Sequence, residues 1–301
     1  MDFRSHLDIV FKHAGGVDIA LDVYELPGEP PRPAMLYFHG GALMRGSKRM
    51  SPTQRDMFLG WGYALVSANY RLAPEAKWPA FRDDILDAHK WVLANAATYN
   101  IDPNRVGVFG GSAGGYLALL LGALARPRPR VVVPFSGYGD VAGPWYAEPD
   151  LFYLSLEREE WDEVRKCIGP VVLTECDDPL KGAFYRYCRQ NGLWPKHVIG
   201  YHPSERPEIF DEACPERLVT PEYPPTFLIH GTADTDVPFS CAQSMYDALQ
   251  RHGVESVLAR IEGGPHGVLG KSPKWPGIDE PQVKAAIRDL GEFLAKHMKQ
   301  P

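Results

Sequence analysis

A serine surrounded by small residues offers the first chemistry in this chain. Gly110-Gly111-Ser112-Ala113-Gly114 matches the GxSxG pattern, and Gly115 follows it. In this pattern the serine stands on a tight turn between a strand and a helix, which exposes its hydroxyl as a nucleophile. We expect the small neighbours to be needed because larger side chains would collide in such a turn. A glycine-rich connector without chemistry would fit the same residues if no base existed elsewhere.

A serine hydroxyl becomes a useful nucleophile only when a base removes its proton. His266 is the expected base, because it lies in a glycine-rich loop, residues 263–267, after the last predicted strand. Asp234 follows another predicted strand and is the acid expected to orient the histidine. Asp236, two residues later, is the alternative acid, or an acid at the N-terminus of the next helix.

A second glycine-rich loop could supply N–H donors for the negative charge that develops on a carbonyl oxygen during acyl transfer. His39-Gly40-Gly41-Ala42 directly follows an apolar strand candidate. We expect the backbone N–H groups of Gly41, Ala42 and Ala113 to form this oxyanion hole. A phosphate-binding loop is less consistent with this segment, because neither Gly-Lys-Ser/Thr nor GxGxxG is present.

The elements that must position these residues alternate along the chain. Alternating apolar and polar residues on both sides of Gly15-Gly16 predict an antiparallel hairpin. Six continuous apolar runs predict buried strands, and five segments between them predict helices. The hairpin strands are 7–14 and 18–24, the apolar runs are 34–38, 63–68, 106–109, 131–135, 226–229 and 257–261, and the helices are 52–59, 81–97, 113–125, 239–251 and 281–299. This order predicts an α/β fold, with a mostly parallel sheet and helices on both faces.

The alternation fails between residues 139 and 222. We therefore expect one domain over residues 1–301, with this segment inserted as a lid over the carboxyl edge of the sheet. The insert is rich in aromatic residues, which form either its own core or an apolar roof over a ligand site. Its Arg186, Arg189 and Arg206 could recognise a charged group, but we expect them to be solvated surface residues.

The composition excludes several classes of function. The 301 residues include 38 acidic and 32 basic side chains, and the net charge of -6 argues against nucleic-acid binding. No apolar run approaches the roughly 20 residues of a membrane span. The polar N-terminus and five scattered cysteines predict a cytoplasmic protein without a disulfide framework. No metal and no cofactor are expected. The composition is compatible with a homodimer.

Together the motifs resemble the α/β-hydrolase superfamily, in its hormone-sensitive-lipase-like and acetylesterase-like carboxylesterase branch. The segments that carry the resemblance are 39–42, 69–75, 110–115 and 230–234. The order of serine, aspartate and histidine along the chain also matches that superfamily. The resemblance implies a Ser112/His266/Asp234 triad and an ester substrate. Gly111 departs from the usual pattern, which has an acidic residue there, and Ala42 stands where a third glycine is usual.

We therefore predict a serine esterase that cleaves a small to medium, largely uncharged carboxylic ester through an acyl-enzyme. An amidase, an aryl formamidase or a peptidase with the same triad is the first alternative. A non-hydrolytic binding protein or lyase on the same fold is the second, because a fold does not determine a function.

Overall fold

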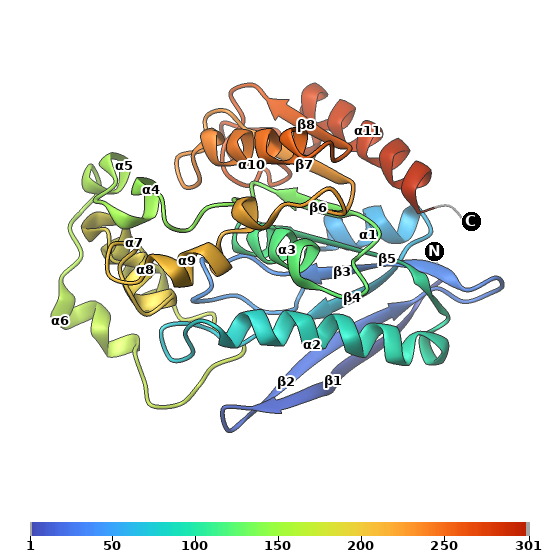
Figure 1. The fold of residues 1–301 in the computed structure, drawn as a ribbon, viewed down its shortest axis with the longest axis horizontal. Coiled ribbons are helices and arrows are strands. Elements are labelled where there is room, and N and C mark those ends of the chain that lie inside the picture. The colour runs from blue at the N-terminus through green and yellow to red at the C-terminus, as the bar shows by residue number, and fades with distance from the viewer. Residues whose placement is uncertain (1, 299–301) are drawn as a thin grey trace.

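A single eight-stranded sheet organises residues 2–298, which are the residues that the computed structural model describes (Figure 1). The strand order is β1-β2-β4-β3-β5-β6-β7-β8. The strands are β1 (Arg4–Ala14), β2 (Val17–Glu25), β3 (Arg32–Phe38), β4 (Ala64–Ala68), β5 (Ile101–Gly111), β6 (Val132–Phe135), β7 (Thr226–Gly231) and β8 (Ser256–Ile261). The β1–β2 and β2–β4 pairs are antiparallel, and the other five pairs are parallel. The predicted α/β sheet and its opening hairpin are confirmed.

Five helices cover the two faces of the sheet (Figure 1). Helices α2 (Ala80–Asn95), α3 (Ala113–Leu124) and α10 (Phe239–Arg251) pack on one face, and α1 (Pro52–Gly60) and α11 (Pro281–His297) pack on the other. Short 3-10 turns, η1 (Ala96–Tyr99) and η4 (Gly277–Asp279), follow α2 and precede α11. All five predicted helices are confirmed, although position 299, the predicted end of the last one, lies outside the described residues.

The strand sequences explain why the sheet lies in the core. Every residue of β4 and β7 is buried, as expected for parallel strands covered by helices on both faces. The edge strand β1 instead has no buried residue, and six of its eleven residues are exposed. Because parallel strands end at a common edge, the loops after β3, β5 and β7 meet there.

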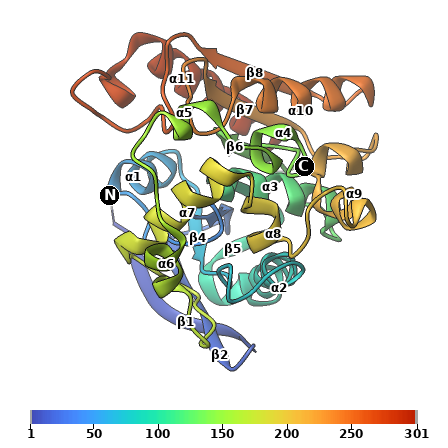
Figure 2. The ribbon, with the colours of Figure 1, turned by 90° about the vertical axis from the view of Figure 1, so that its left-hand side faces the viewer.

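The insert occupies the connection between β6 and β7. It contains α4 (Pro144–Ala147), α5 (Leu151–Leu154), α6 (Trp161–Val164), η2 (Arg165–Cys167), α7 (Pro179–Asn191), α8 (Trp194–Val198), α9 (Pro207–Ala213) and η3 (Pro215–Leu218). Figure 2 shows α4 to α8 in front of one end of the sheet. Tyr146, Phe184 and Trp194 are almost completely buried, so these aromatic residues belong to the core of the insert. Within residues 2–298 no helix combines the length and the apolar character needed to cross a bilayer.

Candidate active site

Ser112 stands on the turn that connects β5 to α3. Its backbone angles are φ 56° and ψ -123°, in a region that residues other than glycine rarely adopt. The turn is held by the Ser112 N–H, which donates to the carbonyl of Phe135 at 2.8 Å, and by the Ser112 carbonyl, which accepts from Tyr116 at 3.0 Å. The hydroxyl therefore lies at the carboxyl edge of the sheet, next to the N-terminus of α3.

His266 and Asp234 meet across the same edge. The His266 Nδ1 lies 2.7 Å from Asp234 Oδ2, within hydrogen-bond distance. The other carboxylate oxygen, Oδ1, accepts the backbone N–H groups of Asp236 and Val237, both at 2.9 Å. His230 Nε2 lies 3.2 Å from Asp234 Oδ2. Asp234 is therefore the acid that contacts Nδ1 of His266, as the chain order predicts.

The electrostatics of this pair follow from burial and hydrogen bonding. Burial acts to raise the pKa of Asp234, but hydrogen bonds from His230 and His266 outweigh it, so the pKa lies well below the ordinary range. Burial acts to lower the pKa of His266. The hydrogen bond to Asp234 and the negative charges of Asp236 and Asp234 outweigh that effect and leave the pKa above its ordinary value.

The loop after β3 lies directly against this turn. An atom added at the Cβ position of Gly40 would lie 2.8 Å from the carbonyl oxygen of Gly111, so only glycine allows this approach. Gly41 and Ala42 both have positive φ angles, 110° and 57°. Within residues 2–298 their backbone N–H groups donate no hydrogen bond, which leaves them available to a ligand. Ala113 is the first residue of α3, where the N–H has no partner inside the helix.

His39 supports the loop instead of serving as a base. Burial lowers its pKa to about 4, so the imidazole is neutral at pH 7. Its Nδ1 lies 2.7 Å from the carbonyl oxygen of Gly40, and its ring stacks on Tyr70 with centroids 4.3 Å apart. The Tyr70 hydroxyl also donates to the carbonyl of His39 at 2.8 Å.

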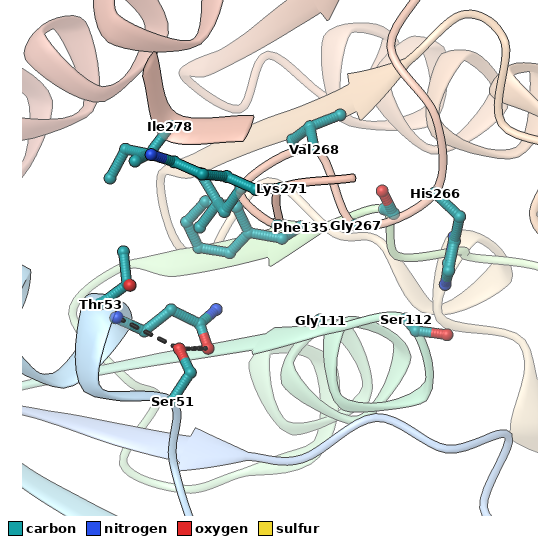
Figure 3. A pocket seen from close by; sticks show the side chains of 14 residues that line it. Ser51, Thr53, Gly111, Ser112, Phe135, His266, Gly267, Val268, Lys271 and Ile278 are labelled. Carbon is teal, nitrogen blue, oxygen red and sulfur yellow. Dashed lines mark hydrogen bonds between the residues drawn. The ribbon is translucent and has the colours of Figure 1, made fainter. Parts of the chain in front are cut away.

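A pocket of about 540 Å³ opens beside Ser112 and His266 (Figure 3). Besides Ser112 and His266, its lining includes four apolar side chains, Phe135, Val268, Leu269 and Ile278, and five polar ones, Ser51, Thr53, Gln54, Ser136 and Lys271. None of the described residues from 139 to 222 lines this pocket. The alternative that the aromatic residues of the insert form the wall of the ligand site does not hold for this pocket.

Several side chains of the insert contact the loops that carry Ala42 and Asp236 without entering the pocket. Arg189 is fully buried, and it pairs with Asp150 at 2.8 Å and with Asp236 at 3.2 Å. Our expectation of a solvated Arg189 is therefore wrong. Trp194 donates through Nε1 to the carbonyl of Ala42 at 3.1 Å. The aromatic residues close to Arg189 in the sequence could have indicated its burial. Its carboxylate partners, Asp150 and Asp236, lie far from it along the chain.

Metal ligands do not gather in the described part of the chain. Within residues 2–298 no group of three or more His, Cys, Asp or Glu side chains could hold a metal ion. All five cysteines are free thiols. Burial raises the pKa of the three buried ones, which suits core residues better than nucleophiles: Cys188, Cys214 and Cys241.

The comparison with family models decides the family. The BD-FAE model matches residues 21–249, which is more than half of the chain. The chain belongs to the BD-FAE family. The match to BD-FAE includes Ser112 and Asp234, whereas His266 lies beyond it.

Longer proteins contain regions similar to this BD-FAE chain. Esterase LipC of Mycobacterium tuberculosis is 27% identical over 252 residues, which cover 82% of this chain and 56% of LipC. The non-reducing polyketide synthase ausA of Aspergillus calidoustus is 27% identical over 338 residues, 94% of this chain and 14% of the synthase. The chain therefore spans about half of LipC and a small part of the synthase.

The solved structures show the fold of this BD-FAE member. An alpha/beta hydrolase superfamily protein from Enterococcus faecalis matches with a TM-score of 0.76 at 20% identity, and the match covers 98% of each chain. The α/β-hydrolase fold predicted from the motifs is thereby confirmed.

Proposed function

We propose that the chain is a serine esterase that hydrolyses small to medium, largely uncharged carboxylic esters. The observation that carries the proposal is the 2.7 Å contact between His266 Nδ1 and Asp234 Oδ2, beside a pocket that Ser112 also lines. The positive φ of Ser112 supports the role of nucleophile, because such strain persists mainly where it serves a function. The similarity to an esterase, LipC, agrees with this activity.

The proposed reaction is a two-step acyl transfer. Ser112 Oγ attacks the ester carbonyl carbon while its proton moves to Nε2 of His266. The proton then passes to the alcohol oxygen as the ester bond breaks, and an acyl-Ser112 remains. In the second step His266 takes a proton from water, the water oxygen bonds to the acyl carbon, and the proton returns to Ser112 as the acid leaves. Asp234 keeps Nδ1 protonated and stabilises the imidazolium that forms in each step.

The oxyanion hole of this proposal consists of backbone N–H groups of Gly41, Ala42 and Ala113. Removing one such donor typically costs about 3 to 4 kcal/mol of transition-state stabilisation. The unpartnered N–H groups of the first two residues support this role. The methyl group of Ala42, in place of the usual glycine, leaves its N–H intact.

The pocket and the insert support the substrate class. Apolar side chains on one wall suit an uncharged acyl or alcohol group, since burying a charge there would cost free energy. We infer that the segment 139–222 acts as a lid that covers the carboxyl edge next to this pocket. The five free thiols agree with a cytoplasmic location.

A fluorophosphonate probe tests the proposal without knowledge of the substrate. Intact-mass spectrometry of the wild type should reveal one covalent adduct, and Ser112→Ala should form none. A series of p-nitrophenyl esters with increasing acyl length then measures turnover and the preferred chain length. An adduct without turnover of any ester would favour an amidase with the same triad. No adduct on the wild type would favour a binding protein or a lyase.

A further inference from the structure

Two carboxylates lie on opposite sides of the His266 ring. Asp234 Oδ2 lies 2.7 Å from Nδ1, and Asp236 Oδ2 lies 3.5 Å from Nε2. Nε2 is the nitrogen that must exchange a proton with Ser112 and with the leaving group. The second carboxylate therefore lies beside the reactive end of the ring.

The insert holds Asp236 in this position. Its Oδ1 atom accepts the hydroxyl of Tyr153 at 2.7 Å and the hydroxyl of Tyr185 at 2.5 Å, and Arg189 Nη1 lies 3.2 Å from the same atom. Oδ2 is the carboxylate oxygen that lies nearest to His266. Asp236 does not cap α10, because the residue before that helix is Pro238 and no side chain caps it. Helix capping therefore does not explain this residue.

Arg189 fixes a positive charge behind that carboxylate. The guanidinium is fully buried, donates to the backbone carbonyl of Asp236 at 2.8 Å and pairs with Asp150 at 2.8 Å. It also lies 4.6 Å from the ring centroid of Tyr153 and 5.1 Å from that of Tyr146. The guanidinium is held rigidly, because moving it away from any of these partners would leave a buried charge less well paired, which costs free energy.

We propose that Asp236 is a positioning residue for His266: anchored by Arg189 and the two tyrosines of the insert, it holds the imidazole beside Ser112 and stabilises the imidazolium that forms when Ser112 gives up its proton. The inference rests on the proposed function, because it assigns Asp236 to the base of that reaction. The anchoring through Arg189 makes the charge state of the base depend on how the insert is docked. The insert thus acts on the reaction without lining the pocket.

The two charges act on His266 in opposite directions. Three charged side chains influence the pKa of His266: Asp234 and Asp236 from the loop after β7, and Arg189 from α7. Asp236 raises the pKa of His266, and Arg189 lowers it. Because only the neutral imidazole can accept the serine proton, activity appears as the pH rises through that pKa. Removing Asp236 should therefore shift the activity profile to lower pH, and removing Arg189 should shift it to higher pH.

The test is the rate of fluorophosphonate labelling of Ser112 as a function of pH, in the full chain. We expect the midpoint for Asp236→Asn to lie below that of the wild type and the midpoint for Arg189→Gln to lie above it. The plateau rate of Asp236→Asn should also fall, but by less than the roughly 100-fold that losing a general base would cost. A residue that only stabilises the fold would lower the rates and leave the midpoints unchanged.

Matched variants separate this role from general damage to the insert. Asp150→Asn removes the other carboxylate partner of Arg189, away from His266, and should leave the midpoint close to that of the wild type. If Arg189→Gln does not fold, Tyr153→Phe replaces it, since it removes one of the three hydrogen-bond donors to Asp236 Oδ1 without changing a charge and should shift the midpoint upward.

Two results would overturn the inference. One is an Asp236→Asn midpoint equal to or above that of the wild type in a folded protein, and the other is an equal shift in Asp150→Asn. Failure of the proposed function is a different result: labelling would then be absent, or would persist in Ser112→Ala.

Discussion

Two neighbouring glycines should respond to the same substitution in opposite ways. A Cβ atom at Gly110 would lie 2.4 Å from the carbonyl carbon and oxygen of Gly114 and 2.6 Å from the carbonyl oxygen of Phe38. All three are backbone atoms, two from the turn that carries Ser112 and one from the neighbouring strand β3. A Cβ atom at Gly111 would have the carbonyl oxygen of Phe135 as its nearest neighbour, at 3.9 Å. The turn thus requires glycine at position 110, whereas position 111 has room for a Cβ atom.

The magnitudes follow from these contacts. Overpacking of this kind costs about 1 to 3 kcal/mol and more when backbone must move, so Gly110→Ala should lower the free energy of unfolding by at least that amount. Gly111→Ala meets no clash, and it restricts the unfolded chain, which is worth roughly 0.4 to 1 kcal/mol in favour of folding. The two variants should therefore differ by about 1.4 to 4 kcal/mol.

Urea unfolding followed by circular dichroism measures both values, and fluorophosphonate labelling reports whether Ser112 remains reactive. Gly111→Ala should keep its labelling, whereas Gly110→Ala should lose most of it. Gly111→Leu extends the test, because Gly111 lines the pocket and a larger side chain there should reduce turnover of long esters more than that of acetate. The reasoning fails if Gly111→Ala destabilises the protein as much as Gly110→Ala does.

Three further outcomes are expected. Asp234→Asn should reduce kcat about ten-thousand-fold through loss of the correct tautomer of His266, far more than Asp236→Asn; a comparable loss in both variants would contradict the assignment of the acid. Trp194→Phe leaves the buried carbonyl of Ala42 without its donor, so it should cost about 1 to 3 kcal/mol in urea unfolding and lower kcat more than it changes KM. Thiol titration with a chromogenic disulfide should modify at most two cysteines in the native protein and five in denaturant, because three are buried: Cys188, Cys214 and Cys241.

The local pattern of the chain determined most of the fold. Alternating residues around Gly15-Gly16 predict the two hairpin strands, and continuous apolar runs predict the other six, because strands covered on both faces have no polar side. The same pattern predicts the ends less well, and β5 begins at Ile101, five residues before the predicted run. The prediction that Ser112, Asp234 and His266 lie at one edge of the sheet has a related basis. Each follows a strand, and the ends of parallel strands meet at one edge of a sheet.

Only the tertiary structure decided what the insert does. Arg189 carries a charge, and charged side chains are almost always exposed, so its residue type favoured a solvated surface. Its burial depends on Asp150, 39 residues earlier, and on Asp236, 47 residues later. Trp194 and Ala42 are 152 residues apart.

The difference has one physical cause. Hydrophobic periodicity and turn chemistry are local, so the order of residues along the chain records them. Packing in three dimensions determines which group pairs with a buried charge, such as Arg189, or with a buried carbonyl, such as that of Ala42. The order of residues does not record this packing. The sequence by itself therefore determined the sheet and the residues at its edge, whereas the folded chain decided which side chains hold them in place.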